Sequence, residues 1–155
     1  MNAYRAKPNN IPWPPIIALA AVLLSVSAGM FIELPFFHGP AFRIAGVALL
    51  VLVVAVDIWS ISTLRAAHTT VMPTRKSTQL VTAGPFGFSR NPIYLGNVLL
   101  LLALGLILAN AWFLIFAALA AIGIQKFAID REELHLLAVF GAEYESYCRR
   151  VRRWL

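Results

Sequence analysis

Two short segments of this chain combine residue types that can do chemistry. In the first, residues 90–94, Asn91 is a favourable N-cap and Pro92 suits a first helical turn, so a helix is predicted to begin there. The free amides of a helix N-terminus favour anions, and Arg90 beside them adds a planar cationic group. Taken alone, the segment indicates either an anion site or a capped helix with an interfacial arginine.

The second segment contains the adjacent carboxylates Glu132 and Glu133. Successive residues of a helix point about 100° apart, so only one of the two can face inward fully. At helical spacing, Glu133 shares a face with Leu137, Phe140 and Tyr144. An acid beside aromatic rings suits a cationic, aromatic ligand. The alternative is an amphipathic helix whose acids pair with nearby arginines.

The composition of the chain determines its class. It has 155 residues, of which 60% are hydrophobic and 13% are charged, a balance typical of membrane proteins rather than soluble domains. Four apolar segments are each long enough to cross a bilayer as a helix. They are residues 16–32, 44–63, 93–109 and 112–129. The sequence therefore predicts an all-α, polytopic membrane protein with four transmembrane helices, forming one membrane-embedded domain over residues 1–155.

The first apolar segment has an alternative interpretation as a signal peptide, but three further spans follow it. The basic residues predict the orientation. Of the 13 Lys and Arg residues, only Arg43 falls on the side opposite to both termini. By the positive-inside rule, both termini and the central loop are cytoplasmic, and we expect the bacterial inner membrane. Topology also explains the net charge of +6, so nucleic acid is not an expected partner.

The connections between the spans predict where function lies. Asn110 and Ala111 form a tight turn, so the third and fourth spans should be an antiparallel hairpin. The loop at residues 64–91 is much longer, and long ordered loops are usually functional. Residues 130–150 are predicted to form one cytoplasmic amphipathic helix. All chemically capable residues then converge on the cytoplasmic face.

Taken together, these motifs resemble a family of membrane methyltransferases that includes isoprenylcysteine carboxyl methyltransferases and phosphatidylethanolamine N-methyltransferases. The resemblance covers residues 64–155. The family pattern has a Gly-Pro-aromatic loop, an Arg-His-Pro-x-Tyr segment that opens a span and, after a helical hairpin, a Glu pair with a Phe-Gly-x-x-Tyr-x-x-Tyr run. The matching residues here are Gly84-Pro85-Phe86, residues 90–94, Glu132-Glu133 and residues 140–147.

One departure from the pattern concerns the acceptor. Asn91 stands where the isoprenylcysteine branch has His, and Asn-Pro-x-Tyr is similar to the phospholipid branch and to many bacterial relatives. The resemblance therefore leaves the acceptor open. It implies a lipid, a prenylated molecule or another hydrophobic small molecule that arrives from the bilayer, methylated on a carboxylate or an amine.

The resemblance also implies a cofactor, S-adenosylmethionine, in a pocket expected between the third and fourth helices and the cytoplasmic cap. Arg90 and the amides after Asn91 would hold its carboxylate, while Tyr94 lines the pocket. Glu132 or Glu133 would meet the α-ammonium or the ribose hydroxyls. The expected cofactor site comprises Gly84, Phe86, Arg90, Asn91, Pro92, Tyr94, Glu132, Glu133, Phe140 and Tyr144, with Arg90 and Glu133 as candidate catalytic residues.

Two other functions compete with methyl transfer. Sterol-type membrane reductases resemble this family near the C-terminal motif but use NADPH, and a membrane scaffold would bind no cofactor. Asp57 lies within the second predicted span, where an ionisable residue is either functional or paired, here with Arg65 or Arg90. The histidines show no metal-ligand spacing, so no metal site is expected.

Overall fold

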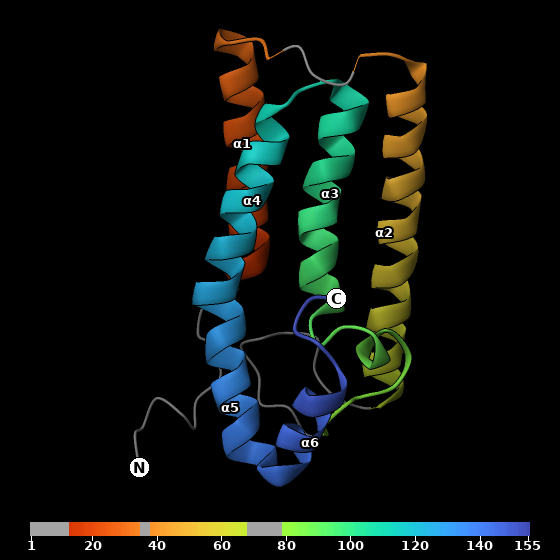
Figure 1. Cartoon of the computed structure of the whole chain (residues 1–155), viewed down its shortest axis with the longest axis vertical. Coiled ribbons are helices and arrows are strands. Elements are labelled where there is room, and N and C mark those ends of the chain that lie inside the picture. Colours follow the sequence, from red (N-terminus) through yellow and green to blue (C-terminus); the bar gives the residue numbers. More distant parts are fainter. Residues whose placement is uncertain (1–12, 35–37, 68–78) are drawn as a thin grey trace.

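The computed structural model describes residues 13–34, 38–67 and 79–155, and its elements are helical, as the sequence predicts (Figure 1). Central α3 stands between α4 and α2, and α5 continues α4 downward (Figure 1). The 3-10 turn η2 precedes α3, and the π-helix η3 joins α4 to α5. In chain order the elements are α1 (Trp13–Phe31), α2 (Pro40–Ala66), η2 (Gly84–Gly87), α3 (Pro92–Leu108), α4 (Trp112–Ile124), η3 (Gln125–Ile129), α5 (Asp130–Phe140) and α6 (Ala142–Arg150).

Three helices of the described chain are long and apolar enough to cross a membrane. They are α1, α2 and the continuous helix Trp112–Phe140, while α3 is a shorter apolar helix. The 17 residues of α3 extend about 26 Å, slightly less than the roughly 30 Å of a hydrocarbon core. Large apolar side chains such as Leu19 and Leu23 lie exposed on the outside of the bundle. A helical bundle with an apolar exterior is an integral membrane protein.

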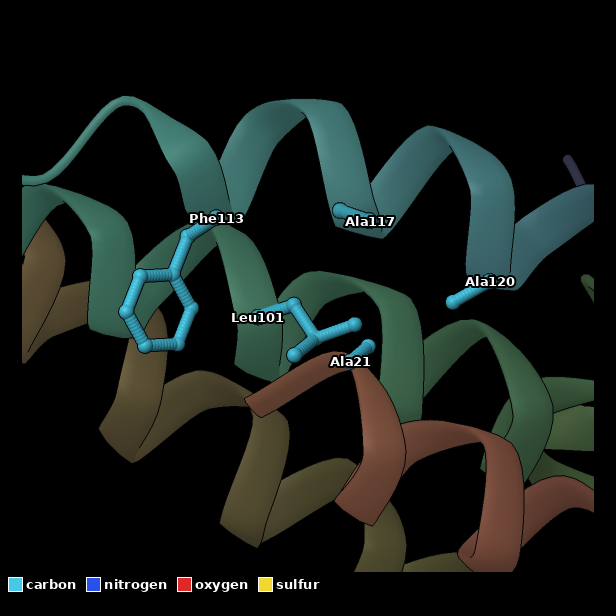
Figure 2. Packing of buried hydrophobic residues seen from close by; sticks show 5 residues of the cluster. All are labelled: Ala21, Leu101, Phe113, Ala117 and Ala120. Carbon is cyan, nitrogen blue, oxygen red and sulfur yellow. The ribbon is translucent and has the colours of Figure 1, made fainter. Parts of the chain in front are cut away.

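A small hydrophobic core packs α3 and α4 against α1. Leu101 of α3 and Phe113 of α4 are fully buried, and Figure 2 shows Leu101 lying between α4 and α1. Ala21, Ala117 and Ala120 complete the cluster. Small residues at such an interface let helix backbones approach closely, which favours dispersion contacts in a lipid environment. The core therefore fixes α3 and α4 relative to each other.

The predicted hairpin of the third and fourth helices is present, and its turn is tied to α1. Ala109 takes a left-handed conformation with φ 51° after the end of α3. The Asn110 side chain accepts a hydrogen bond from the Trp112 amide at 3.0 Å and donates one to the Ser25 carbonyl at 3.1 Å. This turn lies at the end of the bundle opposite to the two motifs (Figure 1).

The prediction of one helix over residues 130–150 is wrong. Gly141 has φ 52° and ψ −124°, a conformation that side chains disfavour, and it separates α5 from α6. The break turns α6 back beneath the bundle, so residues 151–155 return to the foot of α3 (Figure 1). Part of the predicted loop at residues 64–91 is also helical, because α2 continues to Ala66; residues 68–78 lie outside the described chain.

Candidate active site

A cavity of about 110 Å³ lies at the foot of α3, where both motifs meet. Its walls come from the end of α2, residues 79–81, η2, residues 90–91 with the first turn of α3, one face of α5 and one residue of α6. The lining residues are Leu64, Gln79, Leu80, Val81, Phe86, Arg90, Asn91, Pro92, Ile93, Tyr94, Glu132, Leu136 and Tyr147. The wall therefore combines apolar side chains with a cation, a carboxylate and two phenols.

Tyr94 and Glu132 connect the two motifs inside this cavity. The Tyr94 hydroxyl donates a hydrogen bond of 2.8 Å to Glu132 Oε2. Tyr94 belongs to the first turn of α3, and Glu132 to the first turn of α5. The bond places the Glu132 carboxylate in the cavity wall, facing the N-terminal end of α3.

The second carboxylate of the pair, Glu133, holds two arginines together. Its Oε1 lies 3.1 Å from Arg90 Nη2, and both side chains are mostly buried, with 17% and 13% exposure. Arg153 donates hydrogen bonds to both Glu133 oxygens and pairs with Asp130 at 3.1 Å. The hydrogen bond to Glu133 raises the pKa of Arg153. Glu133 is not among the cavity-lining residues. It orients Arg90 through their ion pair instead of lining the cavity itself.

Arg90 retains a hydrogen-bonding capacity that the protein does not use. Its Nε is buried and has no hydrogen-bond partner among the residues that the structure describes. Arg90 also lines the cavity. A buried donor without a partner costs about 1–3 kcal/mol unless a ligand or water satisfies it. The arrangement suits an anionic ligand in the cavity.

The segment after α6 forms a strap that holds the Arg90 region in place. The Arg90 amide donates to the Arg152 carbonyl at 3.0 Å, and the Asn91 side-chain amide donates to the Arg153 carbonyl at 3.0 Å. Asn91 is the N-cap residue of α3, as the sequence predicts, but its side-chain oxygen accepts no cap hydrogen bond from the helix. Its side-chain Nδ2 instead ties the start of α3 to the strap.

The η2 turn supplies the wall opposite to α5. Gly84 has φ 59°, and an added Cβ would come within 3.0 Å of Thr63 Oγ1 on α2, so this position suits glycine. Tyr147 of α6 donates a hydrogen bond of 2.7 Å to the Phe86 carbonyl. Burial raises the pKa of Tyr147, which keeps its hydroxyl protonated as a donor. Tyr147 thereby links η2 to the C-terminal helices.

The structure brings together six of the residues expected at the cofactor site. Those lining the cavity are Phe86, Arg90, Asn91, Pro92, Tyr94 and Glu132. Gly84, Glu133, Phe140 and Tyr144 are not in the lining; Tyr144 is buried with Tyr147 and Val151, against Phe140. Gly141 ends α5 before Tyr144, but Glu133, Leu137 and Tyr144 of the expected face still line one separate open pocket, whose lining does not include Phe140.

The position of the cavity and two residues at or beside it differ from the expectation. It lies between the start of α3, the end of α2 and α5, which belongs to the expected cytoplasmic cap, and no residue of α4 lines it. Tyr147 and Arg153 were not expected at the site. The second tyrosine of the Phe-Gly-x-x-Tyr-x-x-Tyr run was a usable signal for Tyr147. Nothing in the spacing of the final arginines distinguishes Arg153.

Comparison with known proteins now gives the family. The profile described as phospholipid methyltransferase matches residues 41–143, about two thirds of the chain. This chain belongs to the phospholipid methyltransferase family. Membership indicates a membrane methyltransferase. The matched range includes α2 to α5 and most of the cavity wall, whereas Tyr147 and Arg153 lie beyond it.

Two relatives match shorter stretches of this family member. The nickel-cobalt-cadmium resistance protein NccN of Alcaligenes xylosoxydans xylosoxydans is 37% identical over 76 residues, which cover 49% of this chain and 35% of that protein. An uncharacterized protein of Haemophilus influenzae is 41% identical over 63 residues, which cover 41% of this chain and 100% of that protein. The chain thus spans about a third of the length of NccN. No solved structure matches it.

The site contains no grouping typical of a metal centre. Among the residues that the structure describes, no three His, Cys, Asp or Glu side chains lie close enough to hold an ion together. His38 is exposed and His135 is buried in α5, while His68 lies outside the described chain. The functional groups of the cavity are therefore Arg90, Glu132 and the phenols.

Proposed function

We propose that this protein transfers a methyl group from S-adenosylmethionine to a lipid-like acceptor at the cytoplasmic face of the membrane. The observation that carries the proposal is the convergence of Arg90 and Glu132 on one cavity at the start of α3. Membership in the phospholipid methyltransferase family supports the reaction class. The acceptor is a carboxylate of the isoprenylcysteine type or an amine of the phospholipid type.

The residues of the cavity fit the chemical groups of the proposed cofactor. Its α-carboxylate would receive the unpartnered Nε–H of Arg90, satisfying that buried donor. Its α-ammonium or ribose hydroxyls would meet Glu132, which Tyr94 holds in the wall. Phe86 and Tyr147 line the same cavity and offer aromatic surface to adenine. Glu133 acts indirectly, by orienting Arg90.

Methyl transfer from a sulfonium is an in-line displacement that needs alignment more than acid catalysis. A new bond forms between the acceptor atom and the methyl carbon while the carbon–sulfur bond breaks, and its electron pair remains on sulfur. A carboxylate acceptor attacks directly. An ammonium acceptor must first release a proton, and Glu132 is the carboxylate of the cavity that would take it.

The proposal includes four membrane-spanning helices, with α3 as the fourth beside the three long apolar helices. We place both termini and the cavity on the cytoplasmic side, because the positive-inside rule assigns every Lys and Arg of the sequence except Arg43 to that side. A cofactor then arrives from water, and a lipid reaches the foot of α3 sideways from the bilayer. The bacterial inner membrane is the proposed location.

Calorimetric titration of the purified protein with S-adenosylhomocysteine tests the proposal directly. We expect saturable binding that Arg90→Ala abolishes and that Arg149→Ala, a change at an exposed arginine of α6, leaves intact. NADPH serves as the comparator. Binding of NADPH in place of S-adenosylhomocysteine would favour a membrane reductase, and binding of neither would favour a scaffold.

A further inference from the structure

Two arginines at the end of the described chain take no part in the ion pairs of the candidate active site. Arg150 ends α6, Arg152 belongs to the strap, and both side chains are exposed. The ion pairs within the described chain all involve Glu133 or Asp130, and none includes Arg150 or Arg152. Every Asp and Glu of the sequence lies in the described ranges. The charges of Arg150 and Arg152 are therefore available to a ligand.

Asp57, the carboxylate within α2, does not pair with a cation at this level. The pairing with Arg65 or Arg90 that the sequence suggested is absent among the described residues, where Arg90 pairs with Glu133 instead. Gly96 of α3 faces the Asp57 carboxylate, so this side chain lies between α2 and α3. The exposed arginines thus have no carboxylate partner in the described bundle.

The length of α3 places the strap at one boundary of the hydrocarbon core. The helix extends about 26 Å, nearly the thickness of that core, so its start lies close to a boundary. The strap is bonded to this start, because the Arg152 carbonyl accepts a hydrogen bond of 3.0 Å from the Arg90 amide (Figure 1). Head groups extend roughly 5–7 Å beyond the core on each side. The Arg152 backbone therefore lies at the level of the lipid head groups.

An apolar groove of about 180 Å³ begins at the strap and follows α2 and α3 into the membrane. Near the strap its wall contains Leu155 and Phe88, which are 71% and 70% exposed. Its deep end is formed by Leu52 of α2 and Leu99 of α3. Leu99 follows Pro92, the first residue of α3, by seven residues, so the groove extends about 10 Å along the helix. Such a groove suits one hydrocarbon chain of a lipid.

The cations and the groove lie within reach of a single lipid molecule. Arg152 precedes Leu155 by three residues, so their Cα atoms are at most about 11 Å apart. A guanidinium donates charge-assisted hydrogen bonds to a phosphate. Two unpaired arginines favour a lipid with a net negative charge, because the cationic group of a zwitterionic lipid offsets part of that attraction.

We propose that the strap and the groove together bind an anionic phospholipid, with its phosphate on Arg150 and Arg152 and one acyl chain along the groove. This lipid is a bound regulator and not the methyl acceptor, so the inference does not depend on the proposed function. The Arg152 carbonyl holds the Arg90 amide, so a lipid that fixes the strap also fixes the backbone of Arg90. An anionic bilayer then stabilises the candidate active site.

Native mass spectrometry of the full-length, detergent-purified protein measures the binding. The protein is titrated with phosphatidylglycerol and, as the comparator, with phosphatidylcholine that has the same acyl chains. We expect tighter binding of phosphatidylglycerol. The double variant Arg150→Gln with Arg152→Gln should weaken that binding about tenfold or more, with a smaller effect on phosphatidylcholine. Equal binding of the two lipids by the wild type would overturn the proposal.

A second double variant, Arg131→Gln with Arg149→Gln, removes the same charge elsewhere. Both arginines are exposed, and Arg149 lines the open pocket between α5 and α6, which shares no residue with the groove. This control should bind phosphatidylglycerol within twofold of the wild type. Equal losses in both double variants would indicate attraction to the total charge of the protein and would overturn the assignment of Arg150 and Arg152.

The groove is tested by Leu52→Trp, which adds bulk at its deep end. Leu52 is exposed, and Leu19→Trp at an exposed position of α1 is the matched control. Leu52→Trp should lower the affinity for phosphatidylglycerol severalfold, and Leu19→Trp should not. If both bind as the wild type does, the groove does not hold the chain of this lipid. If Leu52→Trp raises only the KM of a methyl acceptor, the groove belongs to the acceptor and the proposal fails.

Hydrogen exchange in lipid nanodiscs tests the connection to the active site. The Arg90 amide should exchange more slowly in discs that contain phosphatidylglycerol than in pure phosphatidylcholine, and the Arg150→Gln with Arg152→Gln variant should lose this difference. Glycerol 3-phosphate added to phosphatidylcholine discs should give no protection, because it has no chain for the groove. Equal protection by glycerol 3-phosphate would indicate a site for free phosphate, and equal exchange in both discs would show that the lipid does not fix the strap. Either result overturns the proposal.

Discussion

The Tyr94 hydroxyl donates a 2.8 Å hydrogen bond to Glu132 across the cavity, joining residues that are 38 positions apart in the chain. Adjacent Glu133 is not in the cavity lining and forms ion pairs with Arg90 and Arg153. Two neighbouring carboxylates thus have different tasks. Because they point about 100° apart on one helix, a single turn of α5 directs one carboxylate to the cavity and the other to two arginines.

The first prediction concerns Glu132. Glu132→Gln keeps the shape of the side chain but removes its charge, so the affinity for S-adenosylhomocysteine should fall about tenfold or more. Tyr94→Phe should cause a smaller loss, because Glu132 then keeps its charge but not its orientation. Calorimetric titration measures both. Glu143→Gln, at an exposed carboxylate of α6, is the control, and equal affinity of Glu132→Gln and the control would contradict the assignment.

The second prediction concerns Glu133, whose role is to orient Arg90. Glu133→Gln leaves Arg90 without its carboxylate partner and Arg153 with Asp130 alone, so the thermal unfolding temperature should fall together with the affinity. Glu132→Gln should affect affinity more than stability. Thermal unfolding followed alongside titration distinguishes the two residues. If Glu133→Gln lowered affinity with no change in unfolding temperature, Glu133 would be a direct ligand.

Sequence patterns predicted the parts of the fold that depend on hydrophobic runs. The apolar stretches at residues 16–32, 44–63, 93–109 and 112–129 correspond to α1, α2, α3 and α4 with η3, displaced by a few residues at their ends. Length and hydropathy suffice for such elements because a bilayer requires backbone groups to be satisfied within each segment. The number of spans and their orientation remain predictions.

Sequence patterns could not predict which way the C-terminal segment returns. The spacing of Glu133, Phe140 and Tyr144 predicted one face of one helix, but Gly141 with φ 52° divides it. The strap at residues 151–155 then reaches the foot of α3 through backbone carbonyls, which accept hydrogen bonds whatever the side chain. Such contacts leave no residue-type pattern, which is why Arg153 was missed.

The third prediction tests that strap. Arg153→Ala removes the charge that shares Glu133 with Arg90 and pairs with Asp130. The strap should loosen, and the affinity for S-adenosylhomocysteine should fall severalfold although Arg153 is not in the cavity lining. Hydrogen exchange at the Arg90 backbone amide should increase, because its acceptor is the Arg152 carbonyl of the strap. Arg149→Ala, which lacks these contacts, should change neither measurement.

The fourth prediction concerns Tyr147, which sequence patterns indicated only as part of a family run. Tyr147→Phe removes the hydroxyl that donates to the Phe86 carbonyl but keeps the buried ring. Loss of one such hydrogen bond should lower the free energy of unfolding by about 1 kcal/mol, and η2 should become less well positioned. The affinity for S-adenosylhomocysteine should fall, and hydrogen exchange of the backbone amides of η2 should increase. An unchanged unfolding temperature would show that the hydrogen bond from Tyr147 to Phe86 does not stabilise η2.

The last prediction distinguishes a residue that stabilises the fold from the residues that form the cavity. Leu101 is fully buried between α3, α4 and α1, far along α3 from Tyr94, and Leu101→Ala should destabilise the fold by about 2–5 kcal/mol. Leu108→Ala on the same helix is the matched control, because Leu108 is 55% exposed and should cost far less. Where Leu101→Ala remains folded at low temperature, it should bind S-adenosylhomocysteine nearly as the wild type does, since the cavity lies about two helical turns away, at the start of α3. A large loss of affinity with little loss of stability would mean that a change of packing in the core alters the cavity.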